Sequence, residues 1–271
     1  MKRFALIGDP VAYSRSPSLH RTAMSELEIE GEFVAIRVKK ENLSDWLKYE
    51  GRNNFDGIAI TSPHKETIRS FLDGESEVSR LIGAVNTLFW RDKFLVGTNT
   101  DAIGALRAIQ GIINPVGKRV LLLGAGGAAK AIAFALLTAK AQVSLWNRTP
   151  EKALNLAHHF THNEGKQALI HLQENLQKIN PQDFDLVINA TLVGLNEWKS
   201  LLPEDFWLPS HIAMEVIYTP LETKFLADAA AAGAEIITGD QMLIHQAVEQ
   251  FHIWHGKEID PDIMARAFFE N

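Results

Sequence analysis

A lysine and an aspartate in the first 101 residues have the side chains that carbonyl reduction requires. Lys65 ends the run T-S-P-H-K, and Asp101 ends the run N-T-D. A positioned lysine can give a proton to a carbonyl oxygen as that oxygen gains negative charge, and a carboxylate can hold the amine in place. Two plainer interpretations stay open, because a single Lys is usually a surface charge and Asp101 can cap the helix that follows it. The two residues are therefore candidates for acid–base chemistry, since Asp101 can equally pair with Lys65.

Further polar residues follow other apolar runs of the same half. Ser14 and Ser16 alternate in S-R-S, so their hydroxyls can face one direction and bind a carboxylate or a diol. Ser16 also precedes Pro17, and on that ground alone we expect it to be a helix N-cap. Asn86 is the polar residue of the apolar stretch I-G-A-V-N-T. These positions are candidates for binding a small polar substrate.

A glycine-rich turn follows the apolar run at residues 120–123 and precedes an alanine-rich stretch of helical period. In this G-x-G-x-x-A motif Gly124 allows the tight turn, Gly126 lets the backbone approach a pyrophosphate, and Ala129 keeps helix and strand close. The helix N-terminus offers free N–H groups to the anion. The motif alone also fits a plain tight turn, but its place between strand and helix predicts dinucleotide binding.

The charge that follows the next predicted strand indicates which dinucleotide is bound. A NAD-preferring site presents an acidic residue there to the ribose hydroxyls, whereas this chain has N-R-T at 147–149. The guanidinium of Arg148 can bind a 2′-phosphate, and Lys152 adds a second cation. The sequence therefore favours NADP, although Arg148 as a solvated surface residue would leave the preference open.

Short apolar runs alternate with stretches of helical period, which is typical of βαβ units and a parallel sheet. The expected strands are residues 4–7, 33–38, 57–61, 120–123, 143–146, 186–189, 213–217 and 235–238. The expected helices are residues 17–27, 43–48, 64–72, 101–109, 128–139, 150–160, 223–232 and 242–254, with a short last helix ending at 269. The segment 161–182 predicts a short strand in an irregular connection. Glycine and proline break the helical pattern at 110–118, where we expect a domain boundary.

Composition excludes several classes of protein. With 271 residues the chain is long enough for two modest domains, and 46% hydrophobic with 22% charged residues excludes disorder, collagen and coiled coil. The 27 basic and 33 acidic residues give a net charge of −6, so we expect no nucleic acid or anionic membrane as a partner. The absence of cysteine excludes disulfides and thiolate chemistry, and we expect no metal site. The short apolar run before Gly8 is too short for a signal peptide, which predicts a cytoplasmic protein.

Eight motifs in one order make these predictions more specific. They are S-x-S at 14–16, T-x-P-H-K at 61–65, I-G-A-V-N-T at 82–87, N-T-D at 99–101, G-A-G-G-A at 124–128, N-R-T at 147–149, N-A-T at 189–191 and G-x-x-M-L-x-x-Q-A at 239–247. In these motifs the chain resembles the shikimate dehydrogenase family, nearly from end to end. The resemblance implies NADPH-dependent reversible reduction of 3-dehydroshikimate to shikimate, in the pathway to chorismate and the aromatic amino acids.

The resemblance also implies an architecture and a set of site residues. It implies an α/β fold with a discontinuous substrate-binding domain (1–101 and 240–271), a Rossmann-type doubly wound parallel sheet that binds NADP (102–239), and an active-site cleft between them. The implied catalytic residues are Lys65 and its partner Asp101. Substrate binding is implied for Ser14, Ser16, Thr61, Lys65, Asn86, Asp101, Tyr218 and Gln246. Cofactor binding is implied for Gly124, Ala125, Gly126, Gly127, Ala128, Asn147, Arg148, Thr149, Lys152, Thr191, Val216 and Gly239. Family members occur as monomers and as homodimers.

Several positions depart from the family's usual pattern, and two other functions stay open. The departures are Ala59, Ala102, Leu195 and Glu215, where Asn, Gly, Met and Asp are usual. Ala59 matters most, because a lost amide near the substrate hydroxyls can weaken binding or shift specificity. One alternative is a relative that also accepts quinate or uses NAD, since one extra hydroxyl discriminates only modestly; Ser16 and Arg148 favour shikimate and NADP. The other alternative, a silent NADP-binding sensor, has no need of Lys65 and Asp101 together.

Overall fold

The computed structural model describes residues 1–163 and 170–270, which form two compact α/β units. Unit 1 comprises Met1–Gly104 and Leu243–Asn271, and unit 2 comprises Ala105–Met242. The chain passes from one unit to the other inside helix α5 (Asp101–Gln110), upstream of the loop at 110–118 where the sequence predicts a boundary. It returns inside helix α9 (Gly239–His255). The predicted α/β class is confirmed.

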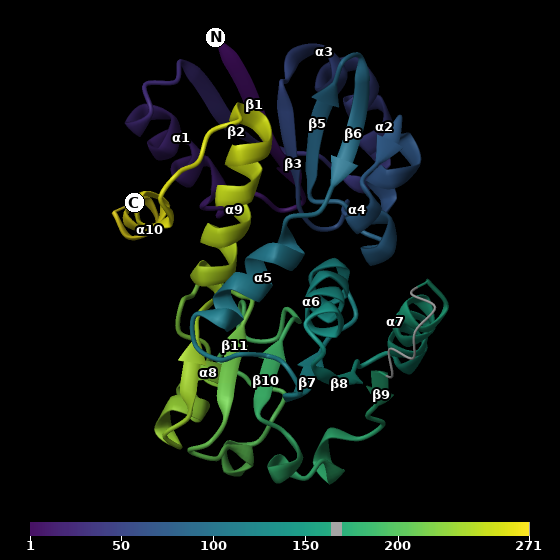
Figure 1. The fold of residues 1–271 in the computed structure, drawn as a ribbon, viewed down its shortest axis with the longest axis vertical. Coiled ribbons are helices and arrows are strands. Elements are labelled where there is room, and N and C mark those ends of the chain that lie inside the picture. The colour runs from purple at the N-terminus through teal and green to yellow at the C-terminus, as the bar shows by residue number, and fades with distance from the viewer. Residues whose placement is uncertain (164–169, 271) are drawn as a thin grey trace. The chain divides into compact units, whose positions relative to one another are not determined.

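Unit 1 is built on a six-stranded sheet with the order β2-β1-β3-β5-β6-β4 (Figure 1). Its strands are β1 (Lys2–Gly8), β2 (Gly31–Arg37), β3 (Gly57–Ile60), β4 (Gly74–Glu75), β5 (Thr87–Arg91) and β6 (Phe94–Thr98). The first three strands are parallel, but β5 and β6 form an antiparallel hairpin that the sequence analysis did not predict. The sheet of this unit is therefore mixed rather than wholly parallel.

Helices pack against this sheet and join its strands. They are α1 (Ser16–Glu26), α2 (Leu43–Trp46), α3 (Arg52–Asn54), α4 (Glu77–Ile82), the greater part of α9, and α10 (Pro261–Phe269). Short 3₁₀ helices lie at Lys40–Asn42 and Thr67–Phe71, and a π-helical turn at Leu47–Gly51 continues α2. Of these, α10 packs on α1. The segment from 243 to the C-terminus thus completes unit 1.

The helix predicted at residues 64–72 is wrong over its first half. Residues 62–66 form turns, and only Thr67–Phe71 is helical, as a 3₁₀ helix. The carbonyl of Lys65, which an α-helix would use for its own bond four residues on, accepts instead from the N–H of Val85 at 2.7 Å. The ring of His64 is held by the carbonyl of Val38 at 2.6 Å. These two long-range bonds fix the segment outside a helix.

Unit 2 has a six-stranded, wholly parallel sheet with the order β12-β11-β10-β7-β8-β9. Its strands are β7 (Arg119–Leu123), β8 (Gln142–Trp146), β9 (Ile170–Leu172), β10 (Leu186–Asn189), β11 (Ile212–Glu215) and β12 (Glu235–Ile237). Its helices are the end of α5, then α6 (Gly127–Thr138), α7 (Pro150–Asn163), α8 (Lys224–Ala231) and short 3₁₀ turns at Leu176–Lys178, Pro181–Asp183 and Glu204–Phe206. The predicted strand in 161–182 is β9, and residues 164–169 of that segment lie outside the described residues.

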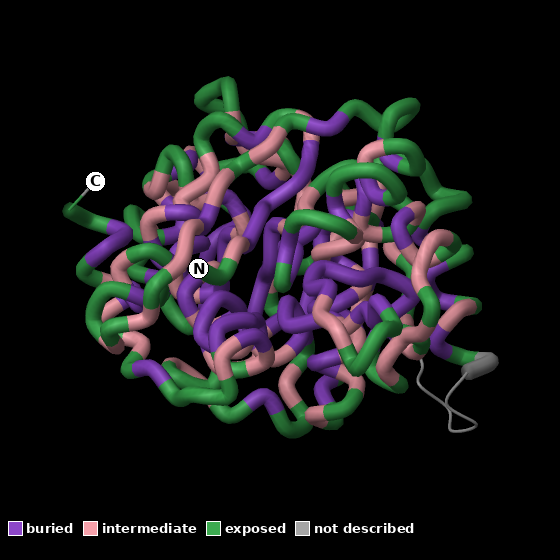
Figure 2. Tube along the Cα trace, turned by 90° about the horizontal axis from the view of Figure 1, so that it is seen from above, coloured by how far each residue is buried: buried purple, intermediate pink, exposed green. Residues whose placement is uncertain are grey.

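The central strands of unit 2 are apolar on both faces, as a parallel sheet covered by helices on both sides requires. Alternate residues point to opposite faces, so Val120 and Leu122 join one core cluster while Leu121 and Leu123 join another. All four side chains are fully buried. Figure 2 shows the buried segments running through the interior of the structure and the exposed segments forming its outer turns.

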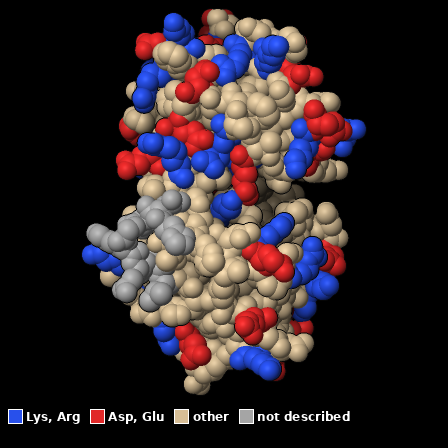
Figure 3. All heavy atoms as spheres, turned by 90° about the vertical axis from the view of Figure 1, so that its right-hand side faces the viewer, with Lys and Arg blue, Asp and Glu red and all other residues tan. Residues whose placement is uncertain are grey.

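Charges of both signs are interspersed on the face drawn in Figure 3, in keeping with 27 basic and 33 acidic residues. In the described part of the chain no group of three His, Asp or Glu side chains is arranged to hold a metal ion. Within the same residues, no helix has both the length and the apolar character needed to span a membrane.

Candidate active site

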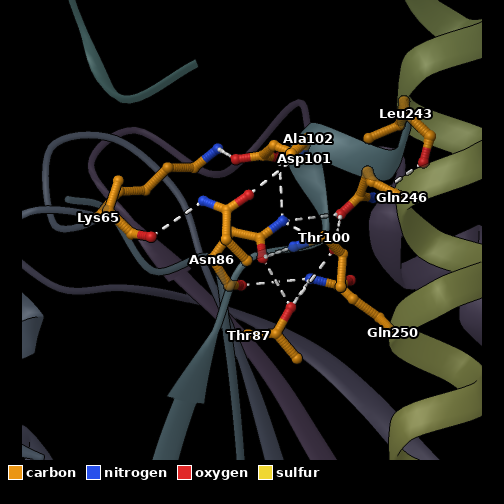
Figure 4. A network of polar contacts seen from close by, with 11 residues as sticks. Lys65, Asn86, Thr87, Thr100, Asp101, Ala102, Leu243, Gln246 and Gln250 are labelled. Atoms are coloured by element: carbon orange, nitrogen blue, oxygen red, sulfur yellow. Dashed lines mark hydrogen bonds and ion pairs between the residues drawn. The ribbon is translucent and has the colours of Figure 1, made fainter. Parts of the chain in front are cut away.

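Lys65 and Asp101 form an ion pair inside unit 1 (Figure 4). The Nζ of Lys65 donates to the Oδ2 of Asp101 at 2.7 Å, and the two side chains are 18% and 6% exposed. Lys65 comes from the turn that follows β3, and Asp101 is the first residue of α5. The two charged groups are thus held in contact, and the Lys65 side chain keeps a small exposure to solvent.

Asn86 holds the other oxygen of that carboxylate. Its Nδ2 donates to the Oδ1 of Asp101 at 2.9 Å and to the Oγ1 of Thr100 at 2.9 Å. Its Oδ1 accepts from the backbone N–H of Thr100 and from the hydroxyl of Thr87, both at 2.8 Å. Because an N–H and an O–H both point at Oδ1, the amide can only turn its NH₂ toward Asp101. The carboxylate therefore accepts from Lys65 on one oxygen and from Asn86 on the other.

Asp101 does not cap its helix through its own side chain. The Oδ1 of Asn99 accepts from the backbone N–H of Ala102 at 3.2 Å, while the Nδ2 of Asn99 donates to the carbonyl of Ala84 at 3.0 Å. Asn99 therefore does the capping, and the carboxylate of Asp101 is left to bind Lys65 and Asn86. The capping interpretation of Asp101 is wrong.

Gln246 reaches the same network from α9. Its Oε1 accepts from Asn86 at 3.4 Å and from the hydroxyl of Thr100 at 3.5 Å, and its Nε2 donates to the carbonyl of Leu243 at 2.8 Å. The side chain is buried, with 6% exposure of the residue. Helical periodicity alone, which puts Gln246 at the border of the apolar stripe, predicts a surface position, and the burial of the side chain contradicts that prediction. The motif predicts a role in the site.

Ser14, Ser16 and Thr61 make no hydrogen bond to this network within the described residues. Ser14 Oγ accepts from the N–H of Ser16 at 3.3 Å, and Ser16 is the first residue of α1, whose N-cap is Arg15. The expectation that Ser16 caps the helix is therefore wrong. The loops after β1 and β3 run together, because the N–H of Asp9 donates to the carbonyl of Ser62 at 2.9 Å. These residues follow neighbouring parallel strands, whose carboxyl ends are where α/β folds build sites.

In unit 2 the predicted cofactor residues gather at the carboxyl edge of the sheet. Gly124 N–H donates to the carbonyl of Trp146 at 2.8 Å, which joins the turns after β7 and β8. Thr191 follows β10 and is fixed by two bonds to the Oδ1 of Asn189. Val216 follows β11, and Gly239 begins α9 against the carbonyls of Val216 and Ile217, too close for any side chain. Tyr218 belongs to the same edge and is half-buried.

The glycine turn fits a dinucleotide phosphate. Gly124 has φ +116°, and a Cβ there would lie 2.7 Å from the carbonyl of Ala190, so only glycine is tolerated. Gly126 is the N-cap of α6 without a side-chain cap, and a Cβ there would meet nothing within 4 Å. The N-terminus of α6 therefore has no side-chain cap, and no neighbouring atom crowds the Cβ position of Gly126, which suits the approach of a phosphate.

The cations expected to bind the 2′-phosphate are exposed. Arg148 and Thr149 follow β8, and Lys152 lies in the first turn of α7; all three are exposed. Asn147 closes the turn by donating from Nδ2 to the carbonyl of Thr149 at 2.8 Å. Among the described residues, Arg148 has no ion-pair partner, so its guanidinium can bind an incoming anion.

Glu215, one of the departures from the family pattern, is the most buried acid of unit 2. Its carboxylate accepts from Asn189, Thr223 and the backbone N–H groups of Val216 and Ile217, at 2.9 to 3.1 Å. Burial raises its pKa to about 7 in spite of these four donors. Its bonds tie the turn after β11 to the turn after β10.

Comparison with known proteins identifies the family. Residues 6–88 match the "Shikimate dehydrogenase substrate binding domain", residues 108–194 match "Shikimate / quinate 5-dehydrogenase", and residues 241–267 match the "Shikimate 5'-dehydrogenase C-terminal domain". The chain is 39% identical over 271 residues to the shikimate dehydrogenase (NADP(+)) of Methanococcoides burtonii, covering 99% of this chain and 98% of that protein.

The chain belongs to the shikimate dehydrogenase family.

Solved structures of the family superpose on the whole chain. The Thermus thermophilus shikimate 5-dehydrogenase, in complex with NADP(H) and shikimate, has a TM-score of 0.90 and 40% identity, covering 100% of this chain and 99% of that one. A quinate dehydrogenase from Corynebacterium glutamicum, in complex with NAD, has a TM-score of 0.88 and 28% identity, covering 100% and 99%. This second likeness makes substrate choice within the shikimate dehydrogenase family an experimental question.

Sequence reasoning missed four residues that the network of this family member contains. Thr87 and Thr100 lie within motifs that the sequence analysis quotes, but their bonds to Asn86 need the hairpin β5–β6 to be known. Gln250 and His20 lie in no motif. The only signal for Gln250 is its place one helical turn after Gln246, on the same face of α9.

Proposed function

We propose that the protein catalyses the reversible NADPH-dependent reduction of 3-dehydroshikimate to shikimate, in the pathway to chorismate and the aromatic amino acids. The observation that carries the proposal is the buried ion pair between Lys65 and Asp101. A chain that only binds NADP has no use for a desolvated pair of this kind, which costs several kcal/mol per ion to bury. The proposal therefore favours an enzyme over a silent sensor.

Unit 1 is proposed to bind the substrate. The hydroxyls of Ser14 and Ser16 take the carboxylate. The family motif adds Tyr218, which belongs to unit 2, as a substrate-binding residue. The ring hydroxyls are bound by Thr61, Lys65, Asn86, Asp101 and Gln246. The polar groups of Asn86 and Gln246 are buried and fixed in direction, which suits selection of hydroxyls at defined positions.

Lys65 is proposed as the acid and base of the reaction. In the reduction its ammonium stabilises the charge that develops on the ketone oxygen and then gives that oxygen a proton, leaving a neutral amine. In the oxidation of shikimate the amine takes the proton back. Asp101 keeps Nζ in place throughout, since its other oxygen is held by Asn86.

Unit 2 is proposed to bind NADP. When bound, NADPH supplies the hydride that reduces the ketone carbon. The residues that hold it are Gly124, Ala125, Gly126, Gly127 and Ala128 at the phosphates, Asn147, Arg148, Thr149 and Lys152 at the adenosine 2′-phosphate, and Thr191, Val216 and Gly239 at the remaining edge. The N-terminus of α6, which has no side-chain cap, and Arg148, which has no ion-pair partner in the described part of the chain, support this assignment.

The proposal also covers the binding partners, the oligomeric state and the cellular location of the protein. We expect a cytoplasmic protein that works as a monomer or a homodimer and needs only substrate and cofactor. The net charge is −6, and the face drawn in Figure 3 carries charges of both signs, whereas a nucleic-acid-binding surface is predominantly basic. Ser16 supports shikimate over quinate.

The proposal is tested with purified protein, 3-dehydroshikimate and NADPH. We expect the amount of NADPH consumed to equal the amount of shikimate formed, with shikimate measured by chromatography. NADPH that binds tightly without being consumed would instead support the sensor.

A further inference from the structure

The polar network of unit 1 extends beyond the proposed catalytic pair to a buried glutamine on α9. Gln250 is 2% exposed and lies one helical turn after Gln246. Its Nε2 donates to the backbone carbonyl of Asn86 at 3.2 Å and to the hydroxyl of Thr87 at 2.9 Å (Figure 4). Gln250 therefore bonds the helix that carries Gln246 to the start of β5.

The orientation of the Gln250 amide follows from its partners. The carbonyl of Asn86 can only accept, so the NH₂ of Gln250 must face it and its Oε1 must face the other way. That Oε1 lies 3.3 Å from the Nε2 of His20, which must therefore carry the proton. The His20 ring is fully buried and stacked on Phe33 with centroids 4.5 Å apart, and burial lowers its pKa to about 3. His20 is thus a neutral, fixed donor.

The bonds from His20 to the ion pair run in one direction. His20 donates to Gln250, Gln250 donates to Thr87, and Thr87 donates to the Oδ1 of Asn86. Asn86 in turn donates to Asp101, on the oxygen not used by Lys65. Because the Thr87 hydroxyl oxygen accepts from Gln250, its own proton is donated to the Oδ1 of Asn86.

The position of Gln246 depends on how α9 is attached to the sheet of unit 1. Its contacts to Asn86 and Thr100 are long, at 3.4 and 3.5 Å, and too weak to fix the helix. The bonds of Gln250 to Thr87 and Asn86, at 2.9 and 3.2 Å, are shorter and attach α9 one helical turn after Gln246.

We propose that Gln250, oriented by His20, is a positioning residue that fixes Asn86 through Thr87 and fixes Gln246 through helix α9. This inference rests on the proposed function, since it assigns Gln250 to the binding of shikimate through those two amides. Within the described residues, no hydrogen bond joins Gln250 to Lys65 or Asp101. We expect the loss of Gln250 to weaken the binding of shikimate and to leave the binding of NADP unchanged.

The test compares two variants that remove side-chain bonds from α9: Gln250→Met removes the two bonds to Asn86 and Thr87, and Trp254→Phe removes one bond to Leu88. Gln250→Met keeps the volume but has no N–H to donate. Trp254→Phe removes the bond from the indole Nε1 to the carbonyl of Leu88, 2.9 Å long, one turn further along the same helix. We expect Gln250→Met to lower kcat/KM for shikimate about tenfold or more, mainly through KM, with KM for NADP within about twofold. Trp254→Phe should leave kcat/KM for shikimate and KM for NADP within about twofold of the wild-type values, even where it lowers Tm.

A second readout needs no catalytic activity. The side-chain amide signal of Asn86, assigned in the NMR spectrum with an Asn86→Asp variant, is expected to shift in Gln250→Met and to stay in place in Trp254→Phe. Wild-type protein that fails to oxidise shikimate overturns the proposed function, while this signal still reports the position of Asn86. The positioning role is overturned if Gln250→Met leaves both kcat/KM and the Asn86 signal unchanged, or if Trp254→Phe alters them equally.

Discussion

Replacing Lys65 by methionine separates the catalytic role of the ammonium from its part in stability. The substitution removes the bond from Nζ to the Oδ2 of Asp101 and leaves that carboxylate, 6% exposed, with Asn86 as its remaining partner. Breaking one side of a buried ion pair costs about 3 to 5 kcal/mol of unfolding free energy. A missing general acid lowers turnover by about 10² to 10⁴.

The double variant Lys65→Met/Asp101→Asn is the matched control. It removes the uncompensated charge, so we expect it to regain most of the stability lost in Lys65→Met while its kcat stays as low. The assays are initial rates with varied shikimate at saturating NADP and urea unfolding of the three proteins. We expect KM for shikimate to change less than kcat. A Lys65→Met protein with kcat within about tenfold of wild type, or a double variant that regains activity, would refute the acid–base role of Lys65.

Three further predictions concern unit 2. Arg148→Gln should raise KM for NADP about 10- to 100-fold and leave KM for NAD unchanged, because a charge-assisted pair to the 2′-phosphate is lost; equal effects on both cofactors would contradict this. Gly126→Val should abolish NADP binding in a titration while Tm stays near wild type, since a Cβ there meets nothing within 4 Å, whereas Gly124→Val, at φ +116°, should lower Tm as well. Burial raises the pKa of Glu215 from 4.5 to about 7, so its contribution to stability is present below pH 4.5 and is lost as pH rises through 7. Relative to Glu215→Gln, wild type should lose about 3 kcal/mol of unfolding free energy across that window, and parallel curves for the two proteins would show that Glu215 does not titrate there.

The sequence predicts those parts of the fold whose signal is local. The apolar runs of unit 2 and the G-x-G-x-x-A turn predict strands and helices close to those of the structure, because a strand buried on both faces reads as a continuous apolar run. Helix α4 and the hairpin β5–β6 were missed although local signals exist. Ser76 caps α4 by accepting from Ser79 N–H, Gly83 ends it at φ +77°, and Asp92 turns the hairpin at φ +57°.

Other features depend on contacts between residues far apart in sequence. Lys65 lies in turns because its carbonyl accepts a hydrogen bond from the N–H of Val85, twenty residues further along the chain. The division between the units falls inside α5, where helical periodicity continues and no break marks it. The motifs predict Lys65 and Asp101 as partners, and the structure adds the geometry of their ion pair. The bonds that connect His20 and Gln250 to the pair required the structure.

The central claim is that this protein is an NADP-linked dehydrogenase of shikimate. Its most direct test is a comparison of initial rates with shikimate and quinate, each with NADP and with NAD, on the same preparation. We predict strong activity with shikimate and NADP, with the other three combinations far weaker. Higher activity with quinate or with NAD, or no activity in any combination, would contradict the claim.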